Sequence, residues 1–148
     1  MARVRDTSYE TTILVRDSCL CLYVQRAARA LARSFDHALR PLGLTNGQFS
    51  LMMSLNRPEA PTIGAVASLL AMDRTTLTAA LKPLQRRGLI RIITSHHDRR
   101  ARLLELTSKG RTLLARSVPV WRSIHSEIEA RFAPGEPDRL RKNLRTLC

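Results

Sequence analysis

Apolar residues recur at helical spacing in long segments near both ends of the chain. Residues 17–39 carry an apolar side chain at every third or fourth position, and Asp17 or Ser18 can cap the helix that this pattern predicts. A second long helix is predicted over residues 107–132. The proline- and glycine-containing segment 133–137 ends it, and a short last helix follows with a row of leucines.

Helix-start signals divide the middle of the chain into three short helices. Thr45 and Gln48 have the spacing of a capping box, in which each side chain bonds the backbone N–H of the other residue. Thr62 and Asp73 are predicted N-cap residues of the next two helices. Gly88 ends the second of these, because glycine readily adopts the left-handed conformation. A tight turn joins the two, so they form a helix-turn-helix.

The periodicity changes after the helix-turn-helix. Residues 89–93 are rich in β-branched side chains, and residues 101–106 form the returning strand, so a hairpin is predicted. Arg99, Arg100 and Arg102 lie at or beside its polar turn. A basic hairpin tip next to a helix-turn-helix can reach DNA phosphates or an adjacent minor groove.

The second helix of the pair has two contrasting faces. A period of 3.6 residues places Leu77, Leu81 and Leu84 on the inward face. The opposite face and its flanks are short, polar and cationic, which fits a DNA major groove about 12 Å wide. The candidate DNA-binding residues of this helix are Arg74, Thr75, Thr76, Thr78, Lys82 and Arg86.

Composition and charge narrow the class of function. The 148 residues carry 25 Lys and Arg against 12 Asp and Glu, a formal charge of +13, and 44% of them are hydrophobic. A disordered basic tail would be poorer in apolar residues. Eight basic and two acidic side chains fall within residues 70–102, on the helix-turn-helix and hairpin. Nucleic acid is therefore favoured as a partner over the alternative that the arginines serve solubility alone.

The same composition bears on location. The chain has no run of about 18 apolar residues that could span a membrane, and its N-terminal segment lacks the apolar stretch of a secretory signal. We therefore expect a cytoplasmic protein with no membrane partner and no cofactor.

A series of motifs follows along residues 18–132. They are Leu42-Gly43-Leu44-Thr45 with Gln48-Phe49, Met72-Asp73-Arg74-Thr75-Thr76-Leu77-Thr78, Arg86-Arg87-Gly88-Leu89-Ile90, Asp98-Arg99-Arg100, and Leu104-Glu105-Leu106-Thr107-Ser108-Lys109-Gly110. Together these motifs resemble the MarR family of bacterial transcriptional regulators.

The resemblance implies a mainly α fold. It is a winged helix-turn-helix with a small β-hairpin wing and a helical dimerisation lobe, in which the first, penultimate and last helices pair two chains. Residues 45–106 would form the DNA-binding lobe, and residues 8–44 with 107–148 the dimerisation lobe. The protein would be a homodimeric repressor.

The resemblance also implies roles for single residues. Arg100 would be the wing arginine and Asp98 would orient arginines, while many family members have arginine where this chain has Ala79. A two-fold dimer sets its recognition helices about one DNA turn apart, so the expected partner is a double-stranded, pseudo-palindromic operator.

Cysteine usage argues against a disulfide framework and against a metal site. Cys19, Cys21 and Cys148 are an odd number in a chain expected in the cytoplasm. On one helix, Cys19 and Cys21 would point about 200° apart, and His96-His97 has no cysteine near it in sequence. We therefore expect no metal site.

Cys19 is a candidate redox residue, with Tyr23 four positions later on the same predicted face. In the first turn of its helix, the helix dipole would favour the thiolate. Residues 19–23 are similar to the first helix of the peroxide-sensing branch of the MarR family, in which thiol oxidation releases DNA. Asn46 and Phe49 stand where that branch has tyrosines. The alternative is that these cysteines are small buried apolar residues.

The family resemblance implies a second kind of signal. Small aromatic anions bind between the two lobes in other members and release DNA. Tyr23, Trp121 and His125 are candidate ligand-pocket residues on this basis, and the alternative is that each belongs to the core or surface.

Two other classes of function, an RNA-binding module and a thiol enzyme, are alternatives to a DNA-binding regulator. A basic RNA- or ribosome-associated module fits the charge, but single-strand readers stack bases on aromatic side chains, and here the aromatics lie mostly on apolar helix faces. A thiol enzyme built on Cys19 would need a base and an orienting acid. His37 is about five turns away on the same predicted helix, so we expect no enzymatic activity.

Overall fold

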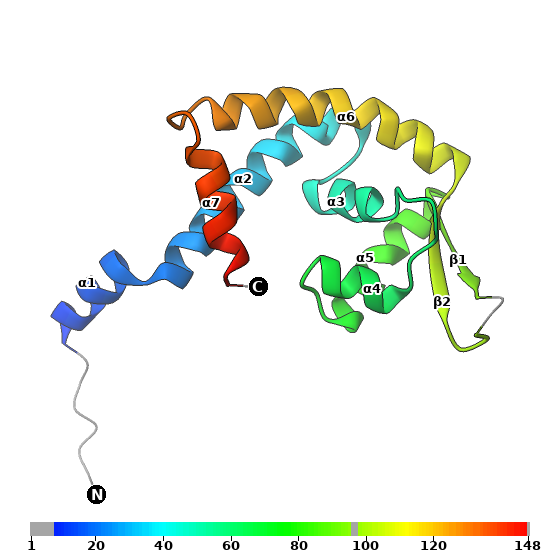
Figure 1. Ribbon diagram of the computed structural model, residues 1–148, viewed down its shortest axis with the longest axis horizontal. Coiled ribbons are helices and arrows are strands. Elements are labelled where there is room, and N and C mark those ends of the chain that lie inside the picture. The colour runs from blue at the N-terminus through cyan, green and yellow to red at the C-terminus, as the bar shows by residue number, and fades with distance from the viewer. Residues whose placement is uncertain (1–7, 96–97, 148) are drawn as a thin grey trace, which may run out of the picture.

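The computed structural model describes residues 8–95 and 98–147, and helices form most of it (Figure 1). In chain order the elements are α1 (Tyr9–Ser18), α2 (Leu20–Leu39), the 3-10 helix η1 (Arg40–Leu42), α3 (Asn46–Ser54), α4 (Ile63–Leu69), α5 (Arg74–Arg86), β1 (Ile90–Thr94), β2 (Arg102–Leu106), α6 (Ser108–Glu129) and α7 (Glu136–Arg145).

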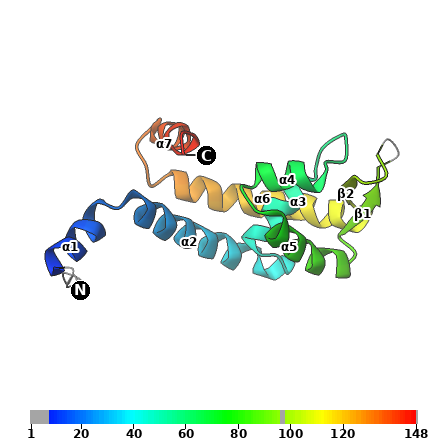
Figure 2. The ribbon, with the colours of Figure 1, turned by 90° about the horizontal axis from the view of Figure 1, so that it is seen from below.

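Two long helices connect the two ends of the molecule. The C-terminal end of α2 packs against α6, and the two helices diverge toward the N-terminus of α2 (Figure 1). Figure 2 shows both helices running between the end that holds α1 and the end that holds the hairpin. Helices α3, α4 and α5 and the hairpin gather at one end, beside the first half of α6, while α1 and α7 lie at the other end (Figure 1).

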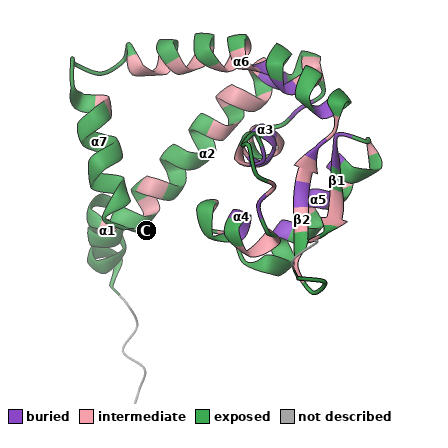
Figure 3. Ribbon diagram, turned by 45° about the vertical axis from the view of Figure 1, so that its right-hand side comes forward, coloured by how far each residue is buried: buried purple, intermediate pink, exposed green. Residues whose placement is uncertain are grey.

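Buried side chains are concentrated at the end that holds the hairpin (Figure 3). Neither α1 nor α7 contributes a buried residue. The largest fully buried apolar side chains are Leu39, Met52, Val66, Leu77, Leu81, Leu84, Leu89, Ile90 and Leu104.

The predicted helix starts in the middle of the chain are confirmed, because an N-cap bonds within its own first turn. The Thr45 hydroxyl accepts from the backbone N–H of Gln48, and Gln48 Oε1 accepts from that of Thr45, both at 3.2 Å. Thr62 and Thr107 each accept from the backbone N–H three residues later, at 3.1 and 3.0 Å.

Four described residues adopt the left-handed backbone region, and two of them, Ala71 and Gly88, flank α5. Gly88, with φ +68°, follows α5 as predicted. Ala71 adopts φ +51° in the turn between α4 and α5, a conformation that costs a residue with a Cβ roughly 1–2 kcal/mol. The backbone N–H of Met72 donates to the Ala67 carbonyl at 2.9 Å and closes this turn, which sets α5 at its angle to α4.

The hairpin is confirmed, although both strands begin one residue later than predicted. β1 and β2 pair antiparallel, with Ile90 opposite Leu106. On the other edge of β2, the backbone N–H of Leu104 donates to the Pro61 carbonyl at 2.9 Å. The loop before α4 is thereby attached to the hairpin, which places the start of α4 beside the wing.

The predicted helix over residues 17–39 is wrong at its start. The chain forms two helices there, with Cys19 between them in an extended conformation (φ −72°, ψ 102°). Cys19, not Asp17 or Ser18, is the N-cap residue of α2, and its side chain makes no capping hydrogen bond. α1 was missed because residues 11–15 are rich in β-branched side chains, which lower helix propensity.

The two helices predicted at the end of the chain are confirmed, although the first of them, α6, is shorter than predicted. α6 ends at Glu129, so Phe132 lies beyond it and is 42% exposed. Arg141 of α7 forms an ion pair with Glu129 and another with Asp138, the latter at 2.6 Å. The ion pair with Glu129 joins α7 to the end of α6, and both contacts raise the pKa of Arg141.

Candidate nucleic-acid interface

α5 buries one face and leaves the other open to solvent, as its period predicts. Leu77, Leu81 and Leu84 are at most 1% exposed. Thr76 and Arg86 are exposed on the outer side. A shallow depression on the outer face is lined by Arg74, Thr75, Thr78, Ala79 and Lys82.

Asp73 begins α5 and is held by Thr76. Its carboxylate accepts from the Thr76 backbone N–H at 2.8 Å and from the Thr76 hydroxyl at 2.5 Å. These two hydrogen bonds lower the pKa of Asp73 below its usual range. The acid therefore stays charged at the positive end of the helix, where it stabilises the recognition helix.

The three threonines of α5 differ in what their hydroxyls can still donate. Thr76 donates to Asp73, and Thr78 donates to the Arg74 carbonyl at 2.7 Å. Thr75 has no side-chain hydrogen bond to any other residue that the structure describes. Of the three, Thr75 therefore presents the free hydroxyl donor to a partner on the outer face.

A hollow of about 480 Å³ lies between α5, the start of α4 and the hairpin. It brings together side chains that are up to 40 positions apart in sequence, including Arg74, Arg100 and the single carboxylate Asp98. The full lining is Thr62, Ile63, Gly64, Arg74, Thr78, Asp98, Arg100, Ala101 and Arg102.

Hydrogen bonds within the hairpin fix its basic tip. Asp98 accepts from the backbone N–H of Arg100 at 2.9 Å, so it orders the turn through the main chain and not through a guanidinium. Arg102 donates to the Thr94 hydroxyl at 3.0 Å and to the Arg99 carbonyl at 3.1 Å. All three arginines are exposed, and Arg102 is the one whose guanidinium makes hydrogen bonds within the described hairpin.

Several motif residues beyond α5 hold the lobe together. Arg87 donates to the Gly43 carbonyl at 2.8 Å, and Lys109 donates to the Arg87 carbonyl at 2.8 Å. A Cβ on Gly110 would lie 2.0 Å from the Leu89 carbonyl oxygen, so only glycine allows α6 to pass this close to the chain after α5. Arg86, one position before Arg87, lies in the last turn of α5 and lines neither hollow described above.

Two of the candidate ligand-pocket residues lie together. Trp121 stacks on His125 with ring centroids 4.6 Å apart and on Phe49 at 6.3 Å. Trp121 and Phe49 line a mainly apolar hollow of about 530 Å³ between α3, α4 and α6, with Arg122 as its charged residue. Nε2 of His125 lies 3.2 Å from Oε1 of Glu129.

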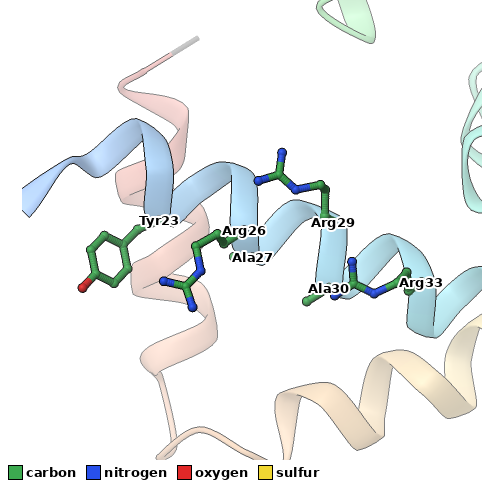
Figure 4. A pocket seen from close by; sticks show the side chains of 6 residues that line it. All are labelled: Tyr23, Arg26, Ala27, Arg29, Ala30 and Arg33. Carbon is green, nitrogen blue, oxygen red and sulfur yellow. The ribbon is translucent and has the colours of Figure 1, made fainter. Parts of the chain in front are cut away.

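Tyr23 lies apart from that hollow. It is 49% exposed on α2 and lines a separate hollow of about 470 Å³ with three arginines of the same helix (Figure 4). Figure 4 shows Tyr23 and Arg26 extending to the same side of α2.

The cysteine geometry differs from the expected one because Cys19 is outside the helix. Cys19 is half-buried and Cys21 is exposed, with its sulfur accepting from Gln25 at 3.2 Å. The prediction that the two cysteines lie on one helix is therefore wrong. In residues 8–95 and 98–147, no three His, Cys, Asp or Glu side chains are grouped to hold a metal ion. His96, His97 and Cys148 lie outside the described residues.

None of the helices in the described part of the chain is long and apolar enough to cross a membrane.

Sequence comparison connects this chain to known regulators. Residues 44–101 match the sequence model of the MarR family. The chain is 35% identical to the HTH-type transcriptional regulator TtmR of Methylorubrum extorquens over 97 residues, which are 66% of this chain and 50% of TtmR. It is 29% identical to the organic hydroperoxide resistance transcriptional regulator of Bacillus subtilis over 101 residues, covering 68% and 69% of the two chains. The chain thus spans about half the length of the first of these relatives.

Structure comparison points to the same group. The crystal structure of the M. tuberculosis transcriptional regulator MosR in complex with DNA superposes with a TM-score of 0.80. The two sequences are 38% identical, and the match covers 88% of this chain and 93% of MosR.

Proposed function

The chain belongs to the MarR family of transcriptional regulators, and on this premise we propose that it is a homodimeric, sequence-specific repressor that binds double-stranded DNA. The observation that carries the proposal is the convergence of Arg74 from α5 and Arg100 from the hairpin on one cationic hollow. MosR, which has the same fold, was crystallised with DNA.

The proposal assigns DNA binding to the helix-turn-helix and the hairpin. Residues 45–106 read DNA, with α5 in the major groove and the hairpin tip at the phosphates or adjacent minor groove. The side chains of Arg74, Thr75, Lys82 and Arg86 on α5 have donors without a partner in the described residues, so they are free to meet bases or phosphates. Thr76 and Thr78 contribute methyl groups, because their hydroxyls already donate within the helix.

Residues 8–44 and 107–147 are proposed to form the dimer. α1 and α7 contain no buried residue, yet they expose Leu14, Val15 and Leu140 to solvent in the single chain, and Leu147 just after α7 is also exposed. Covering such apolar side chains with a second copy would stabilise both helices. A two-fold dimer would then present two α5 helices to a pseudo-palindromic operator about one DNA turn apart.

Two signals are proposed for release of DNA. In the first, the Cys19 thiolate attacks a hydroperoxide oxygen and becomes a sulfenic acid while the alcohol or water leaves; the Bacillus subtilis relative is named for organic hydroperoxide resistance. Cys19 lies at the break between α1 and α2, where added polarity would disturb the orientation of α1. Tyr23 is the candidate hydroxyl neighbour one turn into α2.

The second proposed signal is a small aromatic anion that binds the apolar hollow beside Trp121, with Arg122 and His125 nearby. Trp121 is the only tryptophan of the chain, so a panel of aromatic acids can be screened through its fluorescence. Absence of any saturable change across the panel would remove this hollow as a ligand site.

The proposal places the protein in the cytoplasm, where it meets chromosomal DNA, and assigns it no enzymatic activity, in line with the names of its relatives.

Selection from a random duplex library, followed by fluorescence anisotropy, tests the proposal. The selected duplex is titrated against a shuffled duplex and against the same sequence as RNA. We expect the selected duplex to bind at least about 10³-fold more tightly than the shuffled one. Equal affinities for both duplexes, or tighter binding to RNA, would refute the regulator and favour a general basic nucleic-acid-binding module.

A further inference from the structure

Gly64 occupies the second position of α4, where the backbone does not require glycine. Its φ is not in the left-handed region, and glycine weakens a helix relative to alanine. A Cβ at this position would lie 3.0 Å from Nη2 and 3.8 Å from Cζ of Arg74. The three nearest atoms to that Cβ all belong to the Arg74 guanidinium, so the missing side chain makes room for this group.

Arg74 lies among other basic side chains. It is the first residue of α5, and its guanidinium lies beside Gly64 in the first turn of α4. Arg100 and Arg102 line the same hollow. The neighbouring carboxylates accept hydrogen bonds from other groups: Asp73 accepts from the Thr76 backbone N–H, and Asp98 accepts from the Arg100 backbone N–H.

The Arg74 guanidinium has no hydrogen-bond or ion-pair partner in residues 8–95 and 98–147. The donors of this guanidinium are therefore free to bind acceptor oxygens that arrive from outside the protein.

We infer that Gly64 is a positioning residue for DNA recognition: by lacking a side chain, it provides a seat on α4 for the Arg74 guanidinium in the hollow between α5 and the hairpin. The acceptors are oxygens of duplex DNA, either a phosphate or a guanine edge. The inference rests on the proposed DNA-binding function and adds a residue that makes no contact with DNA through a side chain.

Gly64→Ala and Gly64→Leu test the seat, and Gly47→Ala is the matched control. Gly47 is also the second residue of its helix, and a Cβ there would meet nothing within 4 Å. Alanine and leucine favour helix over glycine, so neither change at position 64 should lower the thermal midpoint. We expect affinity for the selected duplex to fall about threefold in Gly64→Ala and about tenfold or more in Gly64→Leu, and to stay unchanged in Gly47→Ala.

A double-mutant cycle with Arg74→Ala separates positioning from a general structural effect. In the Arg74→Ala background, Gly64→Leu should cause no further loss, because the group that it displaces is gone. Additive losses in the double mutant, or wild-type affinity in Gly64→Leu, would overturn the inference. Failure of the wild type to prefer the selected duplex would instead refute the proposed function itself.

Salt titrations distinguish the two sources of acceptor. If Arg74 binds a phosphate, Gly64→Leu weakens selected and shuffled duplexes alike and reduces the slope of log affinity against log salt by about one. If Arg74 reads a guanine, the loss is confined to the selected duplex and disappears when that base pair is changed. Either pattern supports the seat and names its target.

Discussion

At the scale of single residues, the recognition helix shows how local hydrogen bonds decide which side chains remain available. Thr75, Thr76 and Thr78 are all exposed, but only the Thr75 hydroxyl is not already donating within the described chain. The helical period predicts the outward direction of all three. It does not predict which hydroxyl is engaged, because that depends on the side-chain rotamer relative to Asp73 and the carbonyls of the first turn.

Replacing each hydroxyl by a methyl group tests this difference. Thr75→Val should lower affinity for the selected duplex by about threefold to tenfold, the effect of one lost hydrogen bond. Thr78→Val, its control, should lose less, because that hydroxyl already donates to the Arg74 carbonyl. Anisotropy titrations of both variants measure the contrast, and equal losses would show that the internal hydrogen bond does not matter.

The lowered pKa of Asp73 gives the recognition helix a pH dependence of known sign. When folding lowers the pKa of a carboxyl, the charged carboxylate stabilises the folded protein at any pH above the carboxyl's pKa in the unfolded chain. This stabilisation is lost as the pH falls through the carboxyl's pKa in the folded protein. Thr76 is the cause of the shift through its hydroxyl and its backbone N–H.

Asp73→Asn keeps a capping side chain but removes the titration. We expect the wild type to be more stable than this variant at neutral pH, with the difference shrinking below about pH 4 as the carboxyl protonates. Urea unfolding at a series of pH values measures it. A difference that stays constant down to pH 2 would contradict the assigned role of the carboxylate.

At the scale of elements, caps and turns could be predicted from sequence, whereas the break at Cys19 could not. Thr45, Thr62 and Thr107 bond within their own turns, so a few residues determine the outcome. α1 buries no residue and contains a β-branched segment, so its local sequence carries little helical signal. The contact between Gly64 and Arg74 could not be predicted from sequence either, because it depends on the packing of α5 on α4.

The break between α1 and α2 is where the redox prediction applies. We expect organic hydroperoxide to weaken DNA binding by the wild type and to leave Cys19→Ser unaffected, since the extended Cys19 is the hinge between the helices. Anisotropy before and after oxidant, and again after a reducing thiol, measures the response. Cys21→Ser shows whether the second thiol takes part in the oxidised state. A full peroxide response in Cys19→Ser would exclude Cys19 as the sensor.

At the scale of the whole molecule, charge and apolar surface lie at opposite ends. The densest positive charge is on α5 and the hairpin, and the exposed apolar residues of α1 and α7 are at the far end (Figure 1). The sequence located the basic lobe because its charges are close together along the chain. It could not show that α7 would be held mainly by Arg141, since that depends on contacts between elements.

The dimer prediction is tested by placing a charge on the exposed face of α7. Leu140 is 45% exposed, and Leu140→Glu would bury a carboxylate against a second chain if α7 lies in the interface. We expect this variant to become monomeric and to lose most of its DNA affinity. Met53→Glu, at a residue of similar exposure (39%) on α3, is the control and should remain dimeric. Light scattering after gel filtration measures the molecular mass of both variants. If the Leu140→Glu variant is still a dimer, α7 is excluded from the interface.

Footprinting on the DNA upstream of the protein's own coding sequence tests the central claim most directly, at moderate salt and with excess competitor DNA. The account predicts one protected region with two related half-sites about one helical turn apart, and its loss in Arg74→Ala. Uniform protection along the fragment, or a footprint that Arg74→Ala leaves unchanged, would contradict the claim that α5 and the hairpin of a paired chain read a specific DNA sequence.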